Sequence, residues 1–219
     1  MDPITICAIA GVTLAVATTI AGFARLYCKI ESKQKEIESL QQSLGIYADS
    51  YAFEACDEQM INECRNRLNK LLASQTFKQK LDGKNIDEQR TILKQIVNEM
   101  ADSMKVRVDN LIIEPKESLI LGSEQMNEKG EITLFLNEAL LIVDPDKLLF
   151  TLLHELRHGV QDTSFRNNKW GFSNQRIALW MCGLRNYVQP NENSYNAYFN
   201  QVLEIDANKF ADTVLKLNN

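Results

Sequence analysis

The chain has 219 residues, a formal net charge of −5 and a pI near 5.2, which leaves room for one sizeable domain with appendages. The acidic balance and the lack of a long basic stretch exclude nucleic acid as a main partner, because no part of the sequence would track a phosphate backbone. The five cysteines are odd in number and include no Cys-x-x-Cys pair, which agrees with a reducing compartment.

The first predicted element is an apolar helix that spans a membrane. No charged residue occurs between Pro3 and Ala24, and about 20 apolar residues in a helix cross the hydrocarbon core of a bilayer. The basic residues just after this span are Arg25, Lys29, Lys33 and Lys35. By the positive-inside rule they place the rest of the chain in the cytoplasm. We therefore predict a single-pass membrane protein whose anchor is residues 1–27.

A cleaved signal peptide is the alternative for the same segment. Small residues near Ala21 and Ala24 resemble a cleavage site, although no basic residue precedes the apolar run. This alternative would make the mature protein secreted.

A helical region is predicted next, over residues 28–73. Apolar residues recur there at intervals of three and four, which indicates an amphipathic helix. They are Ile30, Ile37, Leu40, Leu44 and Tyr47. A short coiled coil would use this stripe to form a homodimer, but fewer than three clean heptads are present, which favours packing against the chain's own domain. A second helix is predicted over 50–73.

Residues 74–219 combine helices with a few strands. The polar run 75–84 ends in Asp-Gly and predicts a loop, and a helix follows over 87–104. Strands are predicted at 106–113, 119–121 and 132–136, with a turn at 127–130 and later helices at 174–185 and 192–215. The expected fold is therefore α+β, mainly helical, with a small antiparallel or mixed sheet.

The chain's only two histidines lie on another predicted helix, which opens with Asp144-Pro145 as N-cap and first helical residue. The sequence is His154-Glu155-Leu156-Arg157-His158. On a helix both imidazoles project from one face, one turn apart, which suits two ligands of a tetrahedral zinc ion. Glu155 then stands beside the metal without binding it, where a carboxylate can take a proton from water.

This HExxH motif, and its place after a small sheet and before a later helix, resembles the zincin metallopeptidases. The downstream run Glu204-Ile205-Asp206-Ala207-Asn208 resembles the second motif of the gluzincin branch, as in HtpX-like and ImmA/IrrE-type peptidases. No third histidine exists, so a carboxylate must complete the zinc ligands, and the resemblance implies Glu204. It also implies that Asn208 supports a ligand histidine, and that substrate pairs with an edge strand before the motif helix, here residues 131–136.

Three further charged residues near the motifs receive simpler interpretations. Arg157 is expected to face solvent or to pair with a nearby acid. Asp162 lies four residues after His158, but three ligands on successive turns of one helix would spread over about 12 Å, so it is expected at the helix end or beside a ligand. Asp206 is expected to point away from Glu204.

The predicted function is that of a membrane-anchored zinc metallopeptidase with a zincin-like domain over 74–219. His154, His158 and Glu204 would hold Zn²⁺, and Glu155 would act as general base on a protein or peptide substrate. The candidates for an oxyanion-stabilising group are Tyr187, Tyr195 and Tyr198. The alternative from another class is a membrane-tethered, non-enzymatic interaction protein that retains the zincin-like scaffold.

Overall fold

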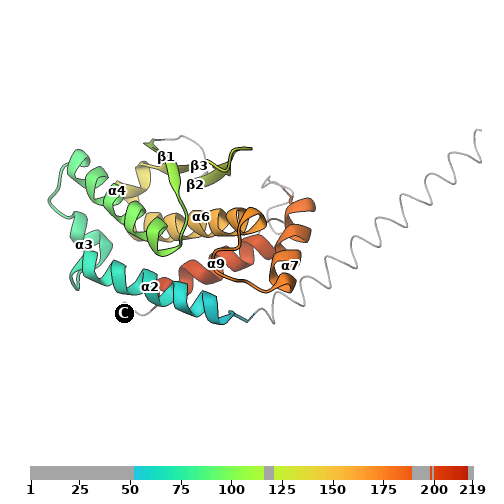
Figure 1. Cartoon of the computed structure of the whole chain (residues 1–219). Coiled ribbons are helices and arrows are strands. Elements are labelled where there is room, and N and C mark those ends of the chain that lie inside the picture. Colours follow the sequence, from blue (N-terminus) through green and yellow to red (C-terminus); the bar gives the residue numbers. More distant parts are fainter. Residues whose placement is uncertain (1–51, 116–120, 189–197, 199, 217–219) are drawn as a thin grey trace, which may run out of the picture. The chain divides into compact units, whose positions relative to one another are not determined.

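A computed structural model of the chain describes residues 52–115, 121–188, 198 and 200–216 (Figure 1). The chain divides into two units, Met1–Asp49 and Ser50–Asn219, and every element below belongs to the second. The predicted membrane span and the amphipathic helix after it lie outside the described residues. Among the helices that the structure describes, none combines the length and apolar character needed to cross a bilayer.

Helices dominate the second unit, and three short strands form one mixed sheet. The elements are α2 (Ala55–Leu72), α3 (Phe77–Leu81), α4 (Ile86–Ser103), β1 (Val108–Glu114), β2 (Gly122–Met126), β3 (Ile132–Asn137), α5 (Ala139–Val143), α6 (Pro145–Arg166), α7 (Asn174–Arg185) and α9 (Val202–Leu215). The strand order is β1-β3-β2, with β1 parallel and β2 antiparallel to β3. The predicted α+β, mainly helical class is confirmed.

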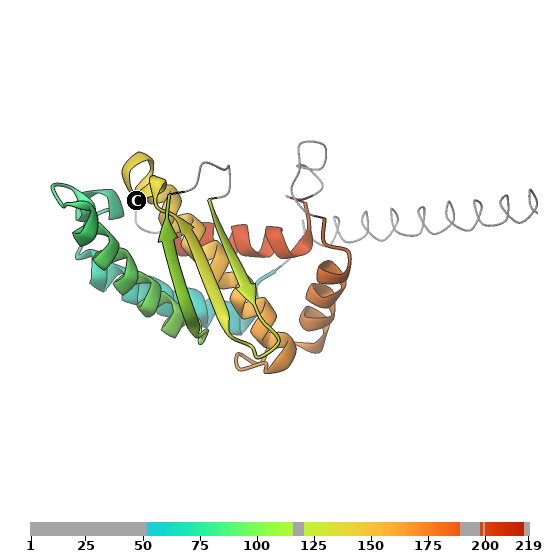
Figure 2. The same cartoon turned by 90° about the horizontal axis from the view of Figure 1, so that it is seen from above.

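Helix α6 lies between the sheet and the helices α2 and α9 (Figure 1). Seen from above, the three strands lie side by side over α6 (Figure 2). The leucines of α6 are buried on several sides of the helix, as a helix packed between two layers requires. The fully buried ones are Leu148, Leu152, Leu153 and Leu156. The helix that carries the histidines is therefore at the centre of the described core.

The start of α6 is set by the capping that its sequence predicts. The side chain of Asp144 accepts a hydrogen bond from the backbone N–H of Lys147 at 3.0 Å, and Pro145 is the first helical residue. A capping oxygen satisfies one of the free N–H groups at a helix start, and proline there loses no helical hydrogen bond. The predicted start of this helix is confirmed, as are the bounds of α7.

The loop predicted over 75–84 is wrong in part, because it contains the short helix α3. The hydroxyl of Thr76 accepts a hydrogen bond from the backbone N–H of Gln79, and the side-chain oxygen of Gln79 accepts one from the backbone N–H of Thr76. This reciprocal capping stabilises a helix start, and the apolar side chains of Phe77 and Leu81 are buried. Burial against the core outweighs the polar composition of the segment.

One strand prediction also needs correction, and another falls largely outside the described residues. Of the strand predicted at 119–121, Leu121 lies just before β2, and residues 119–120 lie outside the described part. The strand over 131–136 was predicted as the sheet edge, but β3 is the central strand, paired on both sides. Its residues are almost all buried, as a central strand requires, whereas β2 is half-buried and ends the described sheet beside α6.

One helix boundary near the C-terminal end of the chain differs from prediction. The helix predicted from residue 192 to 215 is not continuous: Tyr198 is helical, but a turn and a bend at Asn200 and Gln201 separate it from α9, which begins at Val202. The boundary predicted between residues 73 and 74 falls inside the unit Ser50–Asn219, where α2 packs against α4 and α9. Helix α2 is therefore part of the same core as the motif helix.

Candidate metal centre

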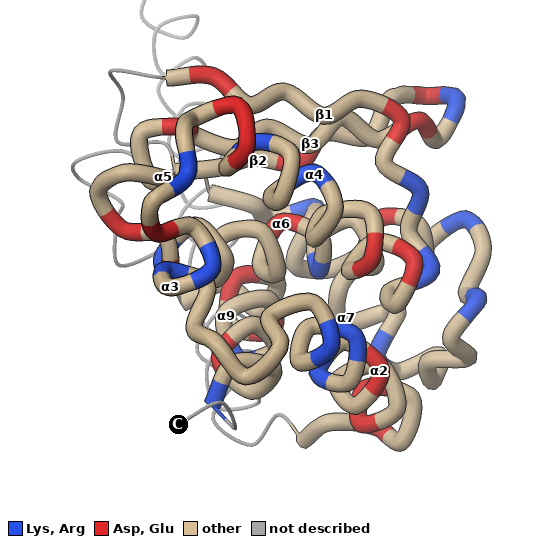
Figure 3. The backbone as a smooth tube through the Cα atoms, turned by 90° about the vertical axis from the view of Figure 1, so that its left-hand side faces the viewer, with Lys and Arg blue, Asp and Glu red and all other residues tan. Residues whose placement is uncertain are grey.

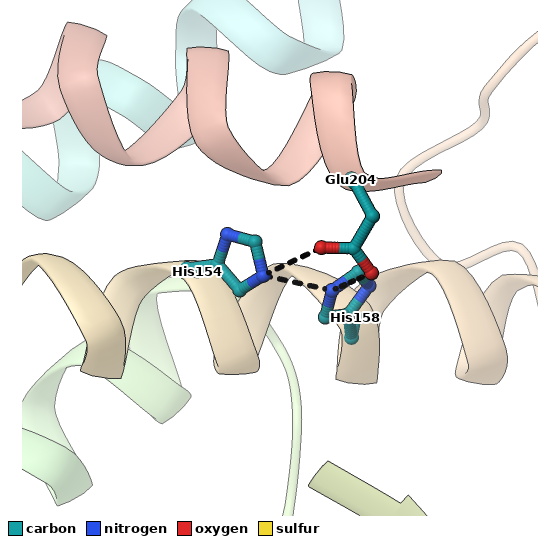
Figure 4. Close-up of side chains that lie close together, drawn as sticks. All are labelled: His154, His158 and Glu204. Carbon is teal, nitrogen blue, oxygen red and sulfur yellow. Dashed lines mark hydrogen bonds and ion pairs between the residues drawn. The ribbon is translucent and has the colours of Figure 1, made fainter. Parts of the chain in front are cut away.

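Three side chains converge where α6 faces the first turn of α9 (Figure 4). The Nε2 atoms of His154 and His158 lie 3.0 Å apart. Oε2 of Glu204 is 3.2 Å from Nε2 of His154, and Oε1 of Glu204 is 3.4 Å from Nε2 of His158. Ala207 and Ala211 on the following turns of α9 are fully buried, and their small side chains permit close packing of α9 on α6.

The ligand atoms of these three residues lie close enough together to hold one metal ion, all within 4.8 Å of one another. Zinc binds imidazole nitrogen and carboxylate oxygen at about 2.0–2.1 Å, which places neighbouring ligand atoms about 3.3 Å apart. Nε2 of His154 lies 3.0 Å from Nε2 of His158 and 3.2 Å from Oε2 of Glu204, whereas the 3.4 Å separation joins Nε2 of His158 to the other carboxylate oxygen, Oε1. Oε2 of Glu204 is buried 3.2 Å from Nε2 of His154, so a cation bound by both atoms would compensate for the burial of this carboxylate. Two imidazole nitrogens and one carboxylate oxygen could hold a divalent transition-metal ion, of which Zn²⁺ is one.

Each histidine is held at its other ring nitrogen by an amide oxygen. Oδ1 of Asn208 is 3.0 Å from Nδ1 of His154, the contact expected of this residue. Oε1 of Gln161 is 2.9 Å from Nδ1 of His158. Such acceptors favour the tautomer that leaves Nε2 free to bind a metal. Gln161 was not anticipated, although it lies three residues after His158 and therefore on the same helical face.

One predicted oxyanion candidate contacts a predicted ligand instead. The hydroxyl of Tyr187 donates to Oε1 of Glu204 at 2.6 Å. Burial and the charge of Glu204 raise the pKa of Tyr187, so the phenol keeps its proton and remains a donor. The Tyr198 ring packs edge-on against Tyr187 with centroids 6.0 Å apart, and Tyr195 lies outside the described residues.

Glu155 is held at the junction of α6 and β2. Burial raises the pKa of Glu155, and the charge of Glu204 adds to the rise, while both histidines and a hydrogen bond from the backbone of Glu124 oppose it. A carboxyl whose pKa lies closer to neutrality is a better general base than an ordinary glutamate. The arrangement therefore fixes the position of Glu155 and raises its proton affinity above that of an ordinary glutamate.

Two more acids lie near this carboxylate. Burial raises the pKa of Glu124 to about 8, and the charges of Asp162 and Glu155 contribute. Burial also raises the pKa of Asp162, which lies inside α6 and does not belong to the group of converging metal-ligand atoms. Asp162 is therefore neither a ligand in this arrangement nor a residue of the helix end.

The stability of the metal-free protein is expected to fall as pH rises from 5 to 9. Burial raises the pKa of Glu124 to about 8 from 4.5, so the native state holds this proton longer than the unfolded chain. Burial lowers the pKa of His158, but hydrogen bonding and the charge of Glu204 outweigh burial and raise it to about 10 from 6.5. A native state that binds more protons loses stability with rising pH, here by a few kcal/mol, on the order of 1.4 kcal/mol per proton and pH unit.

Urea unfolding in the presence of a chelator at several pH values measures this slope. The Glu124→Gln variant removes one of the protons that the native state retains and should flatten the slope between pH 5 and 8. Stability that rises over this range in the unaltered chain would contradict the prediction.

A buried ionic network lies behind the metal-ligand residues. The guanidinium of Arg157 is fully buried and donates to both oxygens of Asp206, at 2.8 and 3.0 Å, and to Asp57 at 2.6 Å. Arg176 donates to the other oxygen of Asp57 at 3.1 Å. Figure 3 shows acidic and basic positions together where α2 and α7 meet. Arg157 does not face solvent, so that alternative is wrong, and its pairing with acids is confirmed; Asp206 points away from Glu204, as predicted.

Comparison of the chain with protein-family models, curated proteins and solved structures finds no match. The functional argument therefore rests on the geometry of the residues just described.

Proposed function

We propose that this chain is a membrane-anchored, zinc-dependent peptidase that hydrolyses peptide bonds with Glu155 as general base. The observation that supports the proposal most is the convergence of His154, His158 and Glu204, whose ligand atoms all lie within 4.8 Å of one another. Three protein ligands leave a fourth position for water or substrate, which distinguishes catalytic from structural zinc sites.

The chain's own residues have distinct tasks in this mechanism. When bound, zinc supplies a Lewis acid that polarises the scissile carbonyl and lowers the pKa of water. Tyr187 donates to Oε1 of Glu204, which leaves Oε2 for the metal. Glu155 takes the proton of the attacking water and returns it to the leaving amine, while the backbone N–H of Glu124 holds its carboxylate in place.

The substrate backbone is proposed to bind along β2, in place of the strand expected from the sequence. β2 ends the described sheet and lies beside α6, so a peptide added there would pass Glu155. Gly122 permits β2 to pack closely against α6, because a Cβ atom at that position would lie 2.6 Å from Cγ2 of Thr151 and 3.1 Å from Cγ of Glu155. A larger residue would push β2 away from the catalytic helix.

The membrane anchor and the cytoplasmic location of the catalytic residues are proposed from the sequence. The apolar run of residues 3–24 and the basic residues after it support both. N-terminal sequencing of the mature protein tests them, because a chain that starts after residue 24 would be a secreted form.

Replacing Glu204 by alanine is expected to weaken zinc binding by at least about 100-fold, since one of three ligands is lost and the two imidazoles remain alone. Zinc content after dialysis and competition with a chromogenic chelator measure the loss. Glu58→Ala on the exposed face of α2 is the matched control and should bind zinc like the unaltered chain. Stoichiometric, tight zinc in Glu204→Ala would remove this residue from the proposed site.

A further inference from the structure

We infer that Gln161 is a positioning residue that fixes the tautomer of His158, and that Asp206 and the backbone carbonyl of Leu203 dictate which way its amide points. This inference rests on the proposed zinc site and deepens it.

The amide of Gln161 is buried and hydrogen-bonded at both ends. Its Nε2 donates to Oδ2 of Asp206 at 2.7 Å and to the carbonyl oxygen of Leu203 at 3.2 Å. Its Oε1 lies 2.9 Å from Nδ1 of His158. A carboxylate and a carbonyl only accept hydrogen bonds, so a flipped amide would place its oxygen against two acceptors. The orientation of the Gln161 amide is therefore determined by its surroundings.

This orientation decides the protonation of His158. The amide oxygen only accepts, so Nδ1 of His158 must carry a hydrogen, and Nε2, which lies beside Glu204 and His154, is then the nitrogen whose lone pair can bind a metal once its own proton is lost. A metal needs that lone pair, and a ring free to hold its hydrogen on Nε2 would have to change tautomer before binding.

Arg157 holds the far end of this chain of hydrogen bonds. It donates to both oxygens of Asp206 and is enclosed by aromatic rings, with its guanidinium 5.2 Å from the Trp180 ring centroid and 4.9 Å from that of Phe210. Asp206 therefore presents Oδ2 to Gln161 from a fixed position. Hydrogen bonds thus connect Arg157 on α6 to Asp206 on α9, and Asp206 through Gln161 to His158, the residue next to Arg157.

Two substitutions at position 161 separate a positioning role from a purely structural one. Gln161→Glu still offers an oxygen to Nδ1 of His158 but brings a second carboxyl group against Asp206, which should destabilise the fold. The methionine side chain in Gln161→Met has a similar length to glutamine and is not charged, so Asp206 repels it less, but it offers no oxygen to Nδ1 of His158. A positioning role predicts that the variant with the less stable fold binds zinc more tightly.

The experiment uses the full-length chain purified without a histidine tag, and compares zinc affinity by chelator competition with urea unfolding of the metal-free protein. We expect Gln161→Met to weaken zinc binding about 10- to 100-fold and Gln161→Glu to change it only a few-fold. The urea midpoint should fall further in Gln161→Glu than in Gln161→Met. The same two substitutions at Gln175, exposed on α7, should affect neither property.

Because the chain has only two histidines, ¹⁵N-histidine labelling gives a second measurement in the zinc-loaded protein. The Nδ1–H of His158 should be protected from exchange in the unaltered chain and in Gln161→Glu, and should exchange faster in Gln161→Met. Zinc affinities that follow the order of fold stability, or that equal the unaltered value in both variants, would overturn the inference. Failure of the unaltered chain to bind zinc would instead refute the proposed function.

Discussion

Replacing Glu155 by glutamine is expected to reduce kcat/KM for peptide cleavage by about 10²- to 10⁴-fold, while zinc stays bound. Glutamine has nearly the same shape and can still accept the hydrogen bond from the backbone of Glu124, but it cannot take a proton from water. The metal-ligand residues are unaltered by this change. The loss should therefore appear in turnover and not in metal content.

Peptide cleavage by purified chain and zinc content measured on the same samples test this expectation. Glu58→Gln, on the exposed face of α2, is the matched control and should cleave like the unaltered chain. Undiminished turnover in Glu155→Gln would show that another group is the base. Mass-spectrometric comparison of proteins cleaved by the two forms would also identify substrates, and a zinc-loaded chain that cleaves none would favour the non-enzymatic interaction protein.

Replacing Arg157 by methionine is expected to lower the free energy of unfolding by about 3–5 kcal/mol. The side chains of Arg157, Asp57 and Asp206 are all fully buried, so the substitution leaves two carboxylates without their shared guanidinium. Arg176 still contacts Asp57 at 3.1 Å and compensates for part of the loss. Arg157→Lys keeps the charge but cannot donate two hydrogen bonds to one carboxylate. Its free energy of unfolding should lie between those of Arg157→Met and the unaltered chain.

Urea unfolding of the metal-free protein measures this loss without interference from zinc. The matched control is Arg67→Met, because Arg67 and Glu99 form a 2.9 Å ion pair whose side chains are 42% and 40% exposed. Exposed pairs contribute about 0–1 kcal/mol, so this variant should change stability little. An Arg157→Met variant as stable as Arg67→Met would show that the ion pairs of Arg157 do not stabilise the packing of α2, α6 and α9.

Local features of the sequence predicted the motif helix and most of its neighbours. Asp144-Pro145 marks the start of α6, and the four-residue spacing places both histidines on one face. The bounds of α7 and the turn before β3 also follow from residues close to each other in the chain. Caps, turns and helical periodicity depend on contacts within a few residues, so short stretches of sequence contain them.

Other features depended on how distant segments pack. β3 has a strand pattern, but only its pairing on both sides makes it central and leaves β1 and β2 as the edges of the described sheet. The strand β2 is polar and half-buried, so its alternation was too weak to place it correctly. For α3, burial of Phe77 and Leu81 outweighed a polar composition that predicted a loop.

The candidate site divides in the same way. The identity of its two histidines and of Glu155 was evident from spacing alone, and resemblance to a known motif added Glu204 and Asn208. The contacts of Gln161 with Asp206, and of Arg157 with Asp57 a hundred residues earlier, arise only when α2, α6 and α9 pack together. Side-chain spacing along a helix is set by backbone geometry, whereas partners from separate helices are chosen by the burial that brings those helices into contact.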